Sequence, residues 1–82
     1  MATHRIVVDV MLKPEILDPQ GQAVANALPS LGFASAESLR IGRHVELALE
    51  AADADAALEQ ATKIADKLLA NPVIEDYVVR LA

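Results

Sequence analysis

The chain has no cysteine and no tryptophan, and it carries one phenylalanine and one tyrosine among its 82 residues. The absence of cysteine excludes disulfides, iron–sulfur ligation and a thiolate nucleophile. With so few aromatic side chains, and with 12 acidic against 7 basic residues, the chain is unsuited to binding nucleic acid. Two histidines without any cysteine argue against a structural zinc site.

Long hydrophobic runs are also missing. The longest are a few residues, far short of the roughly 20 that a membrane helix requires. No basic region followed by an apolar stretch opens the chain, so no signal peptide is expected. These patterns predict a cytoplasmic protein.

The residues that are present predict one small domain spanning 1–82. Hydrophobic residues make up 54% of the chain, but 16 of them are alanine, so the core must come from 24 Leu, Ile and Val residues. A folded monomer of this size hides only about 62% of its extended surface. Small domains without disulfides or metals often gain stability from a partner subunit, so we expect an oligomer.

The segment 5–12 alternates in hydropathy and predicts a strand. Its apolar face holds every even-numbered side chain: Ile6, Val8, Val10 and Leu12. Its other face is partly apolar as well, through Val7 and Met11. We therefore expect helices on one face of the sheet and some other cover on the second.

A helix is expected to begin at residues 18–21. Asp18 is suited to accept hydrogen bonds from free backbone N–H groups as the N-cap, and Pro19 suits the first helical position. Pro29 is disfavoured inside a helix. The helix is therefore expected either to end near Leu28, with one further irregular turn, or to kink. Gly32 is the expected terminator.

The segment 38–50 alternates again, with its apolar side chains at odd positions and Gly42 in the middle. Two structures keep the apolar face in phase. One is a hairpin with a three-residue loop that pairs Ile41 with Val45, and the other is a single long strand bent at the glycine. The bent strand is slightly favoured, and its overhang offers an edge to another subunit.

Residues 53–70 show the clearest helical pattern, with Asp53 and Asp55 at the start and an alanine-rich stripe on one side. Asn71 and Pro72 end this helix, and residues 73–81 predict a last strand. The order β-α-β-(β)-α-β predicts an α+β, two-layer sandwich related to the ferredoxin-like pattern. We expect a mostly antiparallel sheet with both helices on one face.

No self-contained active site is visible. His4 and His44 are more simply explained as solvated surface residues, and no serine stands in a nucleophile motif. The three glycines are isolated, so no phosphate-binding loop is expected. Glu75 and Asp76 are strand neighbours that point to opposite faces, so they cannot act as an acid pair. We expect no catalytic, cofactor-binding or metal-binding residue.

Segments that follow one another along the chain resemble the PurS family, the small subunit of phosphoribosylformylglycinamidine (FGAM) synthase. They are KPEILDPQG at 13–21, LGF at 31–33, RIGRHVEL at 40–47 and ADKLLANPVIEDY at 65–77. The resemblance covers essentially the whole chain in order. Pro29 departs from it, because an ordinary helix-forming residue is expected there.

The resemblance implies a part in the fourth step of de novo purine synthesis. In that step an ATP-dependent, glutamine-hydrolysing ligase complex makes FGAM. The implied role is a non-catalytic one, bridging a glutaminase subunit and a synthetase subunit and assisting ammonia transfer. The resemblance further implies a homo-oligomer, either a dimer or a tetramer. ATP and Mg²⁺ would be used by the complex and not bound by this chain alone.

The motif positions in the connections are the candidates for partner contact. They are Lys13, Asp18, Pro19, Gln20, Gly21, Gly42, Arg43, Asn71 and Pro72. Each group also has a purely structural reading, as a helix cap, a bend or a helix stop. An alternative function for the whole chain is a free-standing regulatory domain that binds small molecules.

Overall fold

The computed structural model describes residues 1–82 and contains a three-stranded sheet with two helices. The elements in chain order are β1 (Ala2–Leu12), α1 (Pro19–Ala27), the 3₁₀ turn η1 (Pro29–Leu31), β2 (Arg43–Ala51), α2 (Ala54–Ile64), the π-helical turn η2 (Ala65–Leu69) and β3 (Glu75–Leu81). No helix is long and apolar enough to cross a membrane.

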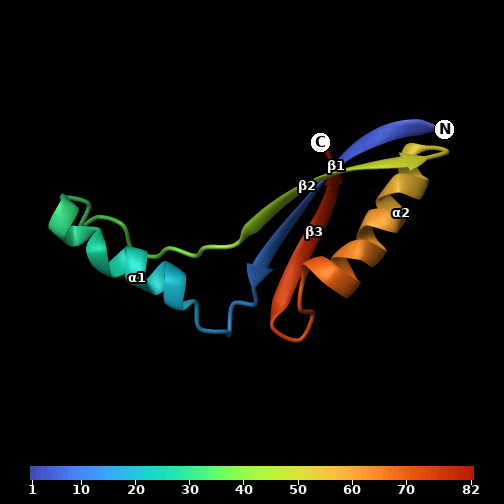
Figure 1. The fold of residues 1–82 in the computed structure, drawn as a ribbon. Coiled ribbons are helices and arrows are strands. Elements are labelled where there is room, and N and C mark those ends of the chain that lie inside the picture. The colour runs from blue at the N-terminus through green and yellow to red at the C-terminus, as the bar shows by residue number, and fades with distance from the viewer.

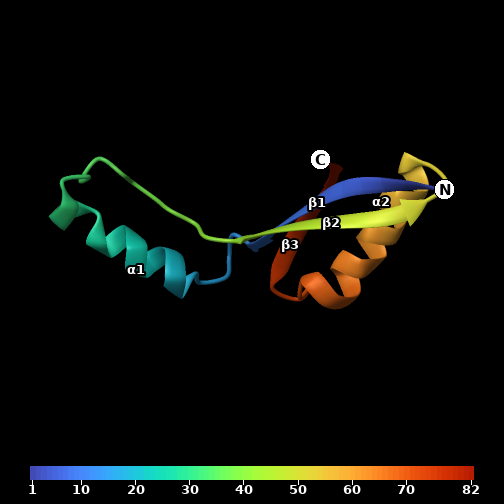
Figure 2. The ribbon, with the colours of Figure 1, turned by 45° about the horizontal axis from the view of Figure 1, so that its top comes forward.

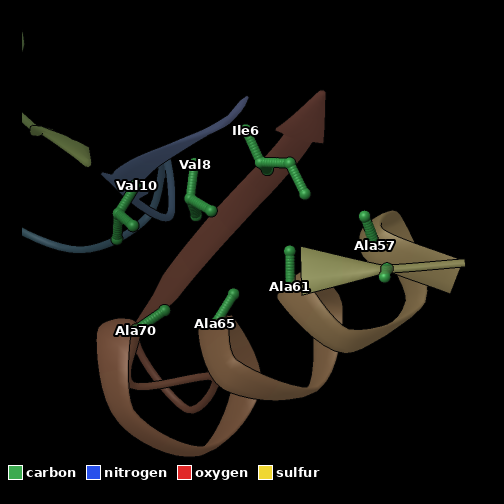
Figure 3. Packing of buried hydrophobic residues seen from close by; sticks show 8 residues of the cluster. Ile6, Val8, Val10, Ala57, Ala61, Ala65 and Ala70 are labelled. Carbon is green, nitrogen blue, oxygen red and sulfur yellow. The ribbon is translucent and has the colours of Figure 1, made fainter. Parts of the chain in front are cut away.

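The sheet has the order β2-β1-β3, and both ladders are antiparallel. At its centre Val8 pairs with Val45 on one side and with Val79 on the other. The buried even-numbered side chains of β1 face α2 (Figure 3). The α+β class, the antiparallel sheet and the expected face of the first strand are therefore confirmed.

Helix α2 packs closely on the sheet because its inner face is made of alanines. Ala57 and Ala61 of α2, with Ala65 at the start of η2, are all 0% exposed, and they lie opposite Ile6 and Val8 (Figure 3). Small side chains let the helix backbone approach the strands. At the start of the helix, the Asp53 carboxylate accepts a 2.8 Å hydrogen bond from the Ala56 N–H, which confirms the expected cap.

Helix α1 does not pack on the sheet, so the expectation that both helices share one face needs correction. Figures 1 and 2 show α1 beyond the end of the sheet, joined to it by extended segments on both sides. Its one substantial contact with another element is with η1. The connections lead away from the sheet, so α1 lies apart from α2 (Figures 1 and 2).

Proline and glycine set the end of α1 as expected. The helix ends at Ala27, the turn η1 follows from Pro29, and Gly32 closes the turn with a left-handed φ of 93°. Of the two alternatives, the one with an early end and one more irregular turn is correct.

The segment 38–50 does not form a hairpin. The chain runs in one direction through Gly42, as in the bent-strand alternative, but regular pairing begins only at Arg43. The β1–β2 ladder ends at the pair Val10–Arg43, although β1 itself continues to Leu12 and pairs there with β3. Residues 38–42 therefore lie beyond the ladder and form no additional strand.

The chain as a whole is extended. Its radius of gyration is 16.3 Å, against about 12 Å for a compact chain of this length. Its accessible surface is 5740 Å², against about 4700 Å² for a typical folded monomer of this mass. Large apolar side chains of the segment around α1 stay exposed, among them Leu17, Leu31 and Phe33. This surface is consistent with the expected self-association.

Candidate functional site

A pocket of about 260 Å³, here called the junction, lies where the segments on both sides of α1 meet the end of the sheet. Its lining residues are Leu12, Asp18, Pro19, Gln20, Ile41, Gly42, Arg43 and Glu75. The fold therefore brings together candidate residues from two segments that lie more than twenty positions apart in the sequence. Gly21, the residue after Gln20, does not line the pocket.

Asp18 is the main anchor of the junction. Its side chain accepts a 2.9 Å hydrogen bond from the Gly21 N–H, which confirms the expected N-cap of α1. Its second oxygen accepts a 2.8 Å bond from the Ile41 N–H. These two backbone donors hold the pKa of Asp18 below its usual range. Asp18 thus ties the chain entering α1 to the chain returning from it.

The two glycines of the junction are required by close packing. A Cβ at Gly21 would collide with the Asp18 carboxylate, and a Cβ at Gly42 would collide with the Val10 carbonyl oxygen and the Met11 sulfur. Gly42 does not have a positive φ, so its role is the close approach of two backbones and not a left-handed bend.

Arg40 closes the connection between β1 and α1, a role that the sequence analysis missed. Its guanidinium donates hydrogen bonds of 3.0 Å to the carbonyl oxygens of Lys13 and Ile16. A guanidinium has five N–H donors and no acceptor, so one arginine can bind several carbonyl oxygens at once. The only signal for this role in the sequence is the position of Arg40 in the RIGRHVEL motif.

Glu75 connects two of the candidate residues, Arg43 and Asn71, and the sequence analysis did not identify it. One of its oxygens accepts a 2.7 Å bond from the Asn71 N–H and a 3.2 Å bond from Arg43. Its other oxygen lies 3.1 Å from the same guanidinium. The Asn71 N–H and the Arg43 charge hold the pKa of Glu75 below its usual range. Arg43 also donates to the Leu69 carbonyl, at the end of η2.

Lys13, Asn71 and Pro72 lie beside the pocket and do not line it. The Lys13 N–H donates a 2.8 Å bond to the Ile74 carbonyl, and its ammonium group lies 3.7 Å from Asp76. Asn71 and Pro72 form a tight turn in which the Ile74 and Glu75 N–H groups both donate to the Asn71 carbonyl. Because this turn occupies residues 71–74, the last strand begins at Glu75 and not at residue 73 as expected.

The open face of the sheet, opposite α2, carries a row of charged side chains. Asp9 on β1 contacts His44 on β2 at 2.7 Å and Arg80 on β3 at 3.1 Å. The second ring nitrogen of His44 lies 3.2 Å from Glu46. The carboxylates of Asp9 and Glu46 raise the pKa of His44. His44 is half-exposed, as expected of a surface residue.

The charged side chains at and beside the junction are bonded within the chain. Asp18, Arg40, Arg43 and Glu75 all bond to other parts of it. These charged groups hold three connections in one fixed shape. Such a surface is suited to contact with another protein.

Comparison with known proteins identifies one family over most of the chain. The PurS family model, described as phosphoribosylformylglycinamidine (FGAM) synthase, matches residues 5–82. A curated relative from Synechocystis, a phosphoribosylformylglycinamidine synthase subunit PurS, is 47% identical over 83% of this chain and 68% of its own length. The Bacillus subtilis subunit of the same name is 45% identical over 90% of this chain and 87% of its own.

Solved structures are similar over the whole fold. The structure of PurLQS from Thermotoga maritima contains a chain with a TM-score of 0.92 at 30% identity, and the match covers 100% of both chains. The B. subtilis PurS structure gives a TM-score of 0.84 at 40% identity, covering 96% of this chain and 98% of that one.

Proposed function

This chain belongs to the PurS family, and we propose that it is the non-catalytic small subunit of FGAM synthase in de novo purine biosynthesis. The observation that carries the proposal is the family match over residues 5–82. It is supported by the full-length likeness to a chain of the Thermotoga PurLQS structure. The family assignment favours this role over a free-standing sensor of small molecules.

The composition supports a subunit without its own chemistry. Release of ammonia from glutamine by a thiolate requires a cysteine, and the chain has none. ATP-dependent ligation requires groups that hold the phosphates and carboxylates that hold Mg²⁺. The glycines of this chain are isolated, and the two acids of the junction, Asp18 and Glu75, are already bonded within the chain. In this proposal the complex uses ATP and Mg²⁺ on its other subunits, in the cytoplasm.

The shape of the chain supports a bridging role. Ammonia in water near neutral pH is mostly ammonium, which is not nucleophilic, so shelter between a glutaminase and a synthetase serves the reaction. An exposed segment around α1 and a rigid junction supply surfaces for self-association and for enzyme contact. We assign contact with the two enzyme subunits to the junction and the Asn71–Pro72 turn beside it.

Gln20 and Pro72 offer a direct test of this assignment. Both are exposed, and the Gln20 side chain makes no hydrogen bond within the chain. The variant Gln20→Ala combined with Pro72→Ala should keep the fold and self-association but weaken binding to the two enzymes in size-exclusion chromatography. Glu59→Gln, on the outer face of α2, is the control. Assembly of the double variant at wild-type affinity would remove the junction from the interface.

The alternative function has its own test. Calorimetry of the isolated chain against amino acids and nucleotides should give no binding. Tight binding of any one of these ligands would support a sensor and count against a purely assembling subunit.

A further inference from the structure

We propose that Glu75 is a positioning residue for enzyme contact, acting through Arg43 and through the Asn71–Pro72 turn. The inference rests on the proposed function, because it concerns the same surface. It goes beyond it by naming one carboxylate as the group that fixes the shape of that surface.

Glu75 connects three separate parts of the chain. It stands at the first position of β3, while Arg43 stands at the first position of β2 and Asn71 follows η2. Its carboxylate receives the Asn71 N–H at 2.7 Å and the two terminal nitrogens of Arg43 at 3.2 and 3.1 Å. A two-pronged contact between a guanidinium and a carboxylate fixes orientation as well as distance.

The side chain of Glu75 is the protected member of this pair. It is 11% exposed, whereas the Arg43 side chain is 55% exposed. The buried partner therefore orients the exposed one, and Arg43 is the group that an enzyme surface reaches. Arg43 is also tied to the end of η2, because it donates to the Leu69 carbonyl there. Leu68 of the same turn is 82% exposed.

All the groups around the Glu75 carboxylate are hydrogen-bond donors. The variant Glu75→Gln keeps the volume, and its remaining oxygen can keep the bonds from the Asn71 N–H and from one Arg43 nitrogen. The other oxygen becomes an NH₂ group, which cannot accept from the second Arg43 nitrogen, and the negative charge of the ion pair is lost. The variant therefore tests the arrangement of the donors and leaves the packing nearly unchanged. Glu59→Gln makes the same chemical change at a site that contacts only Lys63.

The test is a double-mutant cycle on enzyme affinity, with Glu75→Gln, Arg43→Gln and the double variant in the full-length chain. Binding to the glutaminase and synthetase subunits is measured by surface plasmon resonance. Thermal unfolding and self-association are measured beside it. We expect each single variant to weaken binding about tenfold, which corresponds to about 1.4 kcal/mol. The double variant should weaken it no further than either single variant, because both remove the same arrangement.

A merely structural Glu75 would give a different pattern, with a lower unfolding temperature and unchanged enzyme affinity. Wild-type affinity for Glu75→Gln together with weakened affinity for Arg43→Gln overturns the inference and leaves the proposed function standing. Wild-type affinity for these variants and for the Gln20→Ala, Pro72→Ala variant overturns the assignment of the junction as well. If Glu75→Gln fails to fold, Glu75→Asp takes its place in the cycle, because it keeps the charge but draws the carboxylate back from Arg43 by one methylene.

Discussion

Asp9 and His44 face each other across the β1–β2 ladder, with 2.7 Å between Asp9 Oδ1 and His44 Nδ1. The other ring nitrogen of His44 lies 3.2 Å from Glu46. A neutral imidazole has a single N–H, so it can donate to only one of these carboxylates. The geometry therefore favours the imidazolium form, and Asp9 and then Glu46 raise the pKa of His44.

The first prediction concerns the titration of His44. Its pKa should lie above the ordinary 6.5, and Asp9→Asn should lower it, because the Asp9 side chain is the largest cause of the shift. The measurement is an NMR titration of the imidazole signals. Glu50→Gln, on the same face but without contact to His44, should leave the titration unchanged. A His44 pKa at or below 6.5 in the wild type would contradict the geometry.

The second prediction follows from the same pair and concerns stability against pH. Because the pKa of His44 is raised on folding, His44 contributes stability that is fully present below the unfolded pKa of 6.5. This contribution is lost as pH rises through the pKa of the folded state. The pKa of Asp9 is lowered, so its contribution is present above 3.8 and is lost as pH falls through the folded value. The difference in unfolding free energy between wild type and His44→Gln should therefore be largest between these limits and shrink at alkaline pH. A difference that is constant with pH would contradict this.

The third prediction concerns Gly42. Gly42→Val should weaken assembly more than Glu59→Gln, because any Cβ at this position meets the Val10 carbonyl oxygen, which is part of the backbone and cannot rotate away. The measurement is complex formation with the two enzymes, together with thermal unfolding of the chain alone. Equal complex formation by the two variants would mean that the backbones can separate at no cost.

The fourth prediction concerns the alanine face of α2. Ala61→Leu should destabilise the chain by about 1–3 kcal/mol, because the added methylene groups have no space between the helix and the sheet. Denaturant unfolding measures this effect. Ala56→Leu is the matched control on the same helix, where Ala56 is partly buried. An equal decrease in the free energy of unfolding for Ala56→Leu would show that the effect is not specific to the closely packed face.

The fifth prediction concerns the anchor of α1. Asp18→Ala should accelerate hydrogen exchange at the Gly21 and Ile41 amides, whose acceptors are the two Asp18 oxygens. Exchange within α2 should stay unchanged. Unaltered protection of the Ile41 amide would show that Asp18 is a local cap and nothing more.

Local patterns in the sequence identify most of the elements correctly. The alternation of 5–12, the caps at Asp18 and Asp53, and the effects of Pro29 and Gly32 are properties of neighbouring residues, and each appears in the structure. The placement of α1 failed because it depends on long-range geometry. The ladder with β2 stops two residues before β1 ends, and hydropathy along 38–50 carries no record of that limit.

In the candidate site, too, local motifs were predictive and long-range contacts were not. Motif positions such as Asp18, Gly42 and Arg43 do meet in the junction. Arg40 and Glu75 were missed because their partners lie 27 and 32 positions away, and charged residues on strands are ordinarily solvated. The fact that Glu75 and Asp76 point to opposite faces excluded an acid pair but did not show that Glu75 points toward Arg43.

The central claim is that the chain contributes assembly and no chemistry, and reconstituted FGAM synthase tests it most directly. FGAM formation is measured for the glutaminase and synthetase subunits with and without this chain, using either glutamine or ammonium as the nitrogen source. The account predicts that omitting the chain abolishes the glutamine-dependent rate and leaves the ammonium-dependent rate unchanged. A full glutamine-dependent rate without the chain, or loss of the ammonium-dependent rate, would contradict it.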